Sequence, residues 1–158
     1  MRKRKPKLRI TTPDPRYGDI LVTKFVNNLM WAGKKGLAFD LFYTAMDKIA
    51  EKGVEEDSSP LDVFKSALIN ATPQVEVRSR RIGGATFQIP TEIPGKRKTS
   101  IGMKWLIRFA RERNGKGFAE KLAAELMAAS KGEGAAVKRK EDTHRMAESN
   151  RAFAHFRA

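Results

Sequence analysis

The stretch from residue 74 to residue 90 decides the fold: Gln74-Val75-Glu76-Val77-Arg78-Ser79-Arg80-Arg81-Ile82-Gly83-Gly84-Ala85-Thr86-Phe87-Gln88-Ile89-Pro90. Its apolar residues alternate with polar ones on both sides of the glycine pair, first at Val75 and Val77 and then at Phe87 and Ile89. A period of two around such a pair is typical of two strands joined by a tight turn. The stretch therefore predicts a β-hairpin with its tip near Arg80 to Gly84.

On both sides of this hairpin, apolar residues repeat every three to four positions, which is typical of helices with one buried face. Asp19 is placed to cap the first helix, and Ser59-Pro60 is a favourable start for the third. Glycine and proline separate the segments. About six helices are expected, marked by Leu21, Phe25 and Leu29; by Leu37, Leu41, Ala45 and Ile49; by residues 59–71; by Ile101, Trp105 and Phe109; by Phe118, Leu122 and Leu126; and by residues 135–149.

The chain of 158 residues fits a single domain. We expect a mainly α fold of about six helices, with the hairpin protruding between the third and fourth. A basic extended arm at 1–18 precedes this helical domain, which spans 19–158. Residues 94–99 are expected to form a basic loop. Among the aromatic residues, Trp31, Trp105, Phe109 and Phe118 are assigned to the core, and Phe87 and Tyr17 to contacts with a base or with the hairpin root.

Charge points to an anionic partner. The 32 Lys and Arg residues against 18 Asp and Glu give a net charge of +14, which repels itself in the compact state. Nucleic acid, an anionic membrane surface and an acidic protein are the options, and nucleic acid is favoured. No apolar run approaches the roughly 20 residues of a membrane helix, so no membrane partner is expected.

Two basic regions are candidates for RNA contact. Six of the eight residues from Arg2 to Arg9 are basic, and such a run stays extended until a polyanion neutralises it. In the hairpin, arginines supply planar forks for phosphate and glycines permit close approach. The alternatives are a solvated tail and an ordinary hairpin whose arginines keep its edges soluble. The hairpin candidates are Arg78, Arg80, Arg81, Gly83 and Gly84.

Lys34 and Lys35 stand near the start of the second helix, where the helix dipole favours an anion. An ordinary charged loop explains them equally well. His144 and His155 lie 11 residues apart without metal-ligand spacing, and no serine sits in a nucleophile elbow. His144 is better explained as a polar helix residue. We therefore expect no catalytic residue, no metal, no cofactor and no small-molecule substrate.

Several motifs resemble a known family. They are Phe25-Val26-Asn27-Asn28-Leu29-Met30 with Gly33-Lys34-Lys35, the run Pro73 to Gly84, and the ending Lys140-Glu141-Asp142-Thr143-His144-Arg145-Met146-Ala147-Glu148. Together they resemble ribosomal protein seven of the small subunit in its bacterial form. The resemblance implies six helices with a protruding hairpin, binding to the 3′ major domain of 16S rRNA, and a role in starting assembly of the subunit head. It also implies a hairpin near the exit-site tRNA and the mRNA exit, and a cytoplasmic location within the small ribosomal subunit beside neighbouring ribosomal proteins.

Carried over by position, the resemblance implies rRNA contacts at two sets of residues. The first set is Arg2, Lys3, Arg4, Lys5, Lys7, Arg9, Lys34, Lys35, Lys96, Arg97 and Lys98, with the hairpin candidates. The second and weaker set is Lys138, Arg139 and Arg145. The chain departs from the commonest family pattern at Gly36 and in the loop 53–59, neither of which touches the binding motifs.

Three other functions compete with this one. A helical DNA-binding regulator would need basic residues on a recognition helix after a short turn, whereas here they gather in an arm, a hairpin and loops. Some members of the resembled family also bind their own mRNA and repress its translation. A nucleic-acid enzyme would need a metal or an acid-base cluster, which the sequence does not offer.

Overall fold

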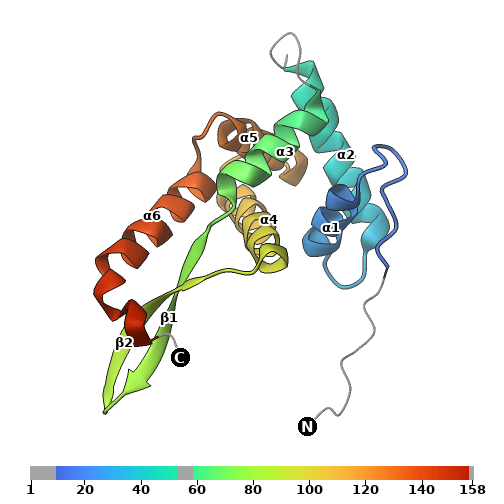
Figure 1. Cartoon of the computed structure of the whole chain (residues 1–158). Helices are drawn as coiled ribbons and strands as arrows, with labels where there is room; N and C mark the ends of the chain where they lie inside the picture. Colours follow the sequence, from blue (N-terminus) through green and yellow to red (C-terminus); the bar gives the residue numbers. More distant parts are fainter. Residues whose placement is uncertain (1–9, 53–58, 157–158) are drawn as a thin grey trace.

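The computed structural model describes residues 10–52 and 59–156, and the chain order of its elements confirms the predicted mainly α fold (Figure 1). Three helices precede the hairpin and three follow it, with a short 3₁₀ helix at the end. The elements are α1 (Ile20–Leu29), α2 (Lys35–Glu51), α3 (Pro60–Ala71), β1 (Val75–Ile82), β2 (Ala85–Glu92), α4 (Gly95–Glu112), α5 (Phe118–Ser130), α6 (Ala135–Ser149) and η1 (Arg151–Phe156).

The core lies where α1 to α5 pack together. Three fully buried rings meet at its centre: Phe25 of α1 lies 5.5 Å from Phe42 of α2 and 5.2 Å from Phe64 of α3, centroid to centroid. Edge-to-face packing, as between Phe42 and Phe64, adds to the free energy gained by burying the rings. Helix α5 packs against α2, α3 and α4 and closes the bundle.

Local capping explains two helix starts. Ser59 and Asp62 form a capping box at α3, as the sequence predicts. The side chain of Asp19 accepts a hydrogen bond from the backbone nitrogen of Leu21 at 2.8 Å. It also forms an ion pair with Lys65, with 2.9 Å between Lys65 Nζ and Asp19 Oδ2. That ion pair ties the start of α1 to α3, and the hydrogen bond from Lys65 is the main cause of a lowered pKa at Asp19.

The structure corrects three expectations. Trp31 is 74% exposed because it lies in the turn between α1 and α2, after the buried face of α1 has ended. Leu37 is 55% exposed, since α2 buries the face that carries Phe42 and Met46. Residues 95–99 are helical and not a loop, because α4 begins directly after Pro94 and lysine and arginine are good helix formers. Trp105, Phe109 and Phe118 are partly buried and pack against the core.

The hairpin pairs in register from Val75 opposite Glu92 to Ile82 opposite Ala85, so β2 extends two residues past Pro90. Gly83 and Gly84 form the turn with φ of 55° and 91°, a left-handed geometry that other residues adopt with strain. The hairpin extends away from the bundle, and α6 and η1 lie along it (Figure 1).

Candidate nucleic-acid interface

A polar hollow lies between α1 and the first turns of α4. Its lining residues are Leu21, Lys24, Asn27, Asn28, Gly95, Lys96, Thr99, Ser100 and Met103. None of these residues is acidic, and both Lys24 and Lys96 are exposed. Cations, amides and hydroxyls in one hollow can contact phosphate and sugar oxygens together.

The cationic surface continues along α4. A second hollow, lined by Asn28, Lys104, Ile107, Arg108, Arg111 and Glu112, shares Asn28 with the first. The single acid there, Glu112, is paired with Arg108 at 2.9 Å. We call Lys24, Asn28, Lys96, Lys104, Arg108 and Arg111 together the α1–α4 face.

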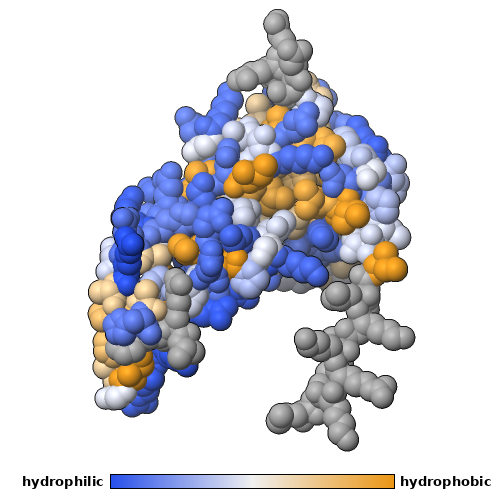
Figure 2. Space-filling model, viewed as in Figure 1, coloured by the Kyte–Doolittle hydropathy of each residue, from blue (hydrophilic) through white to orange (hydrophobic). Residues whose placement is uncertain are grey.

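Sequence analysis found only Lys96 of this face. The signal was present, because Lys104, Arg108 and Arg111 recur at the helical spacing of four and three. The prediction from sequence assigns RNA contacts to an arm, a hairpin and loops, and so it omits these helix residues. Figure 2 shows hydrophobic residues gathered over the helical bundle, a mixture of hydrophobic and hydrophilic residues at the hairpin end, and mostly hydrophilic residues between the two.

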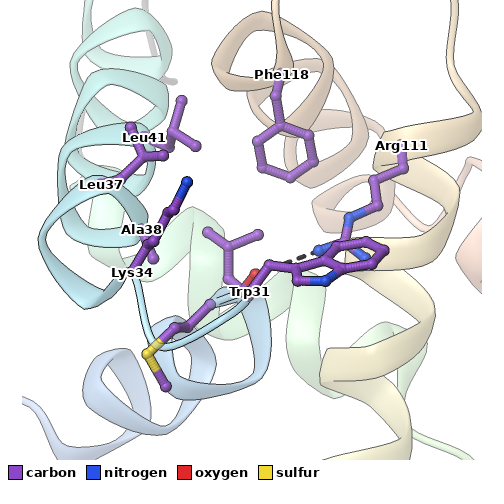
Figure 3. A pocket seen from close by; sticks show the side chains of 9 residues that line it. Trp31, Lys34, Leu37, Ala38, Leu41, Arg111 and Phe118 are labelled. Carbon is purple, nitrogen blue, oxygen red and sulfur yellow. Dashed lines mark hydrogen bonds between the residues drawn. The ribbon is translucent and has the colours of Figure 1, made fainter.

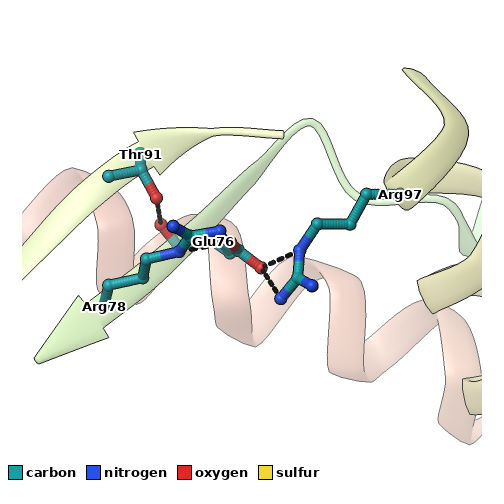
Figure 4. A network of polar contacts seen from close by, with 4 residues as sticks. All are labelled: Glu76, Arg78, Thr91 and Arg97. Atoms are coloured by element: carbon teal, nitrogen blue, oxygen red, sulfur yellow. Dashed lines mark hydrogen bonds and ion pairs between the residues drawn. The ribbon is translucent and has the colours of Figure 1, made fainter. Parts of the chain in front are cut away.

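At the hairpin root, Glu76 holds two of the predicted arginines (Figure 4). Arg78 donates to one carboxylate oxygen with its Nε at 2.6 Å, and Arg97 of α4 donates to the other from Nε at 3.1 Å and Nη2 at 3.0 Å. Partial burial opposes ionisation of Glu76, but the hydrogen bonds from Arg97 and Arg78 keep its pKa below the ordinary value. The two arginines therefore share the negative charge of Glu76. The ion pair between Glu76 and Arg97 also links β1 to α4.

The structure places the other predicted residues on separate surfaces. Arg80 and Arg81 belong to β1, short of the turn that Gly83 and Gly84 make, and both are exposed. Lys34 and Lys35 are exposed at the start of α2. Three predicted cations lie exposed on α6 beside Glu141 and Asp142, a mixed surface: Lys138, Arg139 and Arg145. Residues 2–9 of the predicted arm fall outside the described residues.

The last part of the predicted arm is anchored to α2. Asp14 is 2% exposed and accepts hydrogen bonds from the backbone nitrogens of Arg16 and Tyr17, at 3.1 and 2.8 Å. It also accepts from the hydroxyl of Tyr43 at 2.7 Å; burial, followed by this bond, raises the pKa of Tyr43 to about 12. Tyr17 packs 6.2 Å from Tyr43, so the expectation that it lies at the hairpin root is wrong. This anchor sets where the arm leaves the domain.

Phe87 does lie at the hairpin, as expected, but its ring packs against Phe153 of η1 at 5.2 Å. Ile89 and Pro90 of the same strand are buried. The C-terminal 3₁₀ helix therefore covers β2, which the sequence analysis did not predict.

His144 joins α6 to the hairpin root. Its Nε2 accepts a hydrogen bond from the backbone nitrogen of Gln74 at 3.0 Å. Nε2 can accept this bond only when it carries no proton. Burial, and then the nearby charge of Lys140, lower the pKa of His144 below its ordinary value. The imidazole is thus a structural acceptor at the hairpin root. In the part of the chain that the structure describes, no group of three or more potential ligands could hold a metal ion.

Acidification should loosen this joint. Because the folded pKa of His144 is lowered, its contribution to stability is complete above the unfolded value near 6.5 and is lost as pH falls through the folded pKa. We expect the exchange protection of the Gln74 amide to fall between about pH 7.5 and about pH 5. A His144→Ala variant should show low protection throughout. Protection that falls equally in that variant would assign the effect to another group.

Comparison with known proteins decides the family. The family model described as ribosomal protein S7p/S5e matches residues 1–151. The chain belongs to this family. Its relatives include the small ribosomal subunit proteins uS7 of Porphyromonas gingivalis, 63% identical, and of Flavobacterium psychrophilum, 59% identical, each over 157 residues and 99% of both chains. That of Bacteroides fragilis is 59% identical over the same span. The family resemblance drawn from the motifs is confirmed.

No described helix is long and apolar enough to cross a membrane.

Proposed function

We propose that the chain binds the 3′ major domain of 16S rRNA chiefly through the α1–α4 face. As a member of the ribosomal protein S7p/S5e family it is a structural, non-enzymatic constituent of the small ribosomal subunit, where it binds 16S rRNA and neighbouring ribosomal proteins. The observation that carries the proposal is the hollow between α1 and α4, which presents Lys24, Lys96 and four neutral polar side chains without an acid. Folded RNA is recognised mostly by shape and backbone, which such a surface suits.

Further contacts surround this face. The predicted contacts of the arm, of Lys34 and Lys35, and of the hairpin remain part of the proposal, as does the division into an arm at 1–18 and a domain at 19–158. The α6 cations are weaker candidates because acids stand among them. We place the hairpin, which extends from the bundle, near the exit-site tRNA and the mRNA exit.

Neutralising the α1–α4 face tests the proposal. The variant Lys24→Gln with Lys96→Gln should weaken binding to a 3′ major domain fragment and reduce the salt slope by about two, since two phosphate contacts are lost. The matched control is Lys52→Gln with Lys131→Gln, which removes the same charge from two exposed positions at the ends of α2 and α5. Equal losses in the two variants would show that net charge, and not this face, drives binding.

Substitutions in the hairpin should impair function without lowering the stability of the fold. Arg80 and Arg81 are exposed, so replacing both with alanine should change the free energy of unfolding by no more than about 0.5 kcal/mol. Removing two cations should lower the salt slope of RNA binding by about one to two. Subunits should still assemble, with the defect appearing in exit-site tRNA handling or reading-frame maintenance. Unfolding of the variant, or normal translational accuracy with an unchanged slope, would contradict this.

A further inference from the structure

An apolar pocket opens beside the α1–α4 face (Figure 3). The turn after α1, the first turns of α2, the end of α4 and the start of α5 contribute to it. Its lining residues are Leu29, Met30, Trp31, Lys34, Leu37, Ala38, Leu41, Arg111 and Phe118. The only charged residues among them are the cations Lys34 and Arg111.

Trp31 is held at this pocket while most of its ring stays in water. The guanidinium carbon of Arg111 lies 5.2 Å from the centroid of the indole, and Arg111 Nη2 donates to the backbone oxygen of Leu29 at 3.2 Å. The backbone nitrogen of Lys34 closes the turn onto the oxygen of Trp31 at 3.0 Å, and Ala32 and Gly33 take positive φ of 51° and 75°. The indole therefore has one cationic neighbour and stands on an ordered turn, and yet Trp31 is 74% exposed.

An exposed, fixed aromatic ring at an apolar pocket is a surface for stacking. A nucleobase offers two apolar faces for such a ring, and its flanking phosphates would meet Lys34 and Arg111. Acidic residues are absent from the lining, so the pocket is complementary to a polyanion. Arg111 also lines the second hollow of the α1–α4 face, so one RNA strand can follow that face and reach the pocket.

We propose that the pocket receives an unpaired base of the bound RNA, stacked on Trp31, with Arg111 holding the indole and meeting the adjacent phosphate. This inference rests on the proposed rRNA binding and adds a base-stacking site to it. A phosphate-binding surface reads no bases, whereas a stacking pocket requires an unpaired nucleotide at one place in the RNA.

Affinity measurements with the full chain and a 3′ major domain fragment test the proposal. Trp31→Ala should weaken binding roughly 5- to 150-fold, the equivalent of about 1–3 kcal/mol for one stacked base. The salt slope should not change, because no cation is removed. Trp31→Phe should retain most of the affinity. The matched control is Ile69→Ala, which removes a side chain that is 72% exposed on α3, and it should bind normally.

Fluorescence distinguishes a base from other partners. In a Trp105→Phe background, the emission of Trp31 should be quenched by the RNA fragment but not by heparin, a polyanion without bases. Normal affinity of Trp31→Ala together with unquenched emission would overturn the proposal. If Trp31 became shielded from solvent only in whole subunits, and not on the RNA fragment, that result would also overturn the proposal. It would indicate that Trp31 contacts a neighbouring protein. If the wild-type chain itself binds the fragment without salt dependence, the proposed function fails, which is a separate result.

Discussion

Raising the salt concentration from about 50 to about 200 mM should weaken binding of the chain to a 3′ major domain fragment by roughly 10³–10⁵-fold. The reason is counterion release: each phosphate neutralised by a lysine or arginine frees a condensed cation, at a cost that grows with bulk salt. The net charge of +14 and the α1–α4 face together supply enough cations for on the order of 6–10 such contacts.

The slope of log affinity against log salt counts these contacts and can be assigned to surfaces. We expect the full chain to give a steep slope, and deletion of residues 1–9 to remove the part that the arm contributes. Binding should be measured by titration at four or more salt concentrations, with duplex DNA as a competitor at matched salt. A flat response would show that the charge is not the binding surface.

The hairpin and the helix order follow from local sequence. The alternation of apolar and polar residues around Gly83-Gly84 indicates a β-hairpin. The capping box at Ser59 marks the start of a helix to within a few residues. Such signals need no knowledge of distant contacts. This is why the order of helices, and the place of the hairpin between α3 and α4, could be predicted from the sequence.

The binding face could not be predicted in full, because it is assembled from α1 and α4. Lys24 and Lys96 are 72 positions apart, and only packing of the two helices makes them line one hollow. The exposure of Trp31 could not be predicted either, because it depends on the turn between α1 and α2. Nor could the pairing of Glu76 with Arg97, which joins β1 to α4. A periodic pattern predicts that a residue is on some face, but not which other helix lies next to it.

Glu125 contributes to stability through contacts that also arise only when the helices pack together. It is fully buried in α5, and one carboxylate oxygen accepts from Nε of Arg113 at 2.5 Å while the other accepts from the backbone nitrogen of Ala136 at 3.1 Å. The first bond ties α5 to the residue that directly follows α4, and the second satisfies a donor in the first turn of α6. That turn follows Gly134, which is held at a φ of 95° and offers no side-chain cap.

Glu125→Ala should destabilise the chain by about 3–5 kcal/mol. The change leaves a cavity, a buried backbone donor without an acceptor and a guanidinium without its counter-charge, and removing one member of a buried pair costs this much. For a chain of this length the melting temperature should fall by roughly 10 °C. Glu125→Gln keeps the shape and an acceptor for Ala136 and should lose less. The control Glu120→Ala, at an exposed position in the first turn of the same helix, should stay within about 0.5 kcal/mol.

The position of Glu125 also predicts where the damage spreads. Helix α6 meets the hairpin root through His144, so loosening its first turn should lower amide protection in α6 and β1 before the bundle core opens. The α1–α4 face lies on other helices, so binding of the RNA fragment below the melting temperature should change little. Thermal unfolding and hydrogen exchange of the three variants measure both effects. Wild-type melting of Glu125→Ala, or equal loss of protection in α1 and α6, would show that the buried carboxylate does not hold α6 to the bundle.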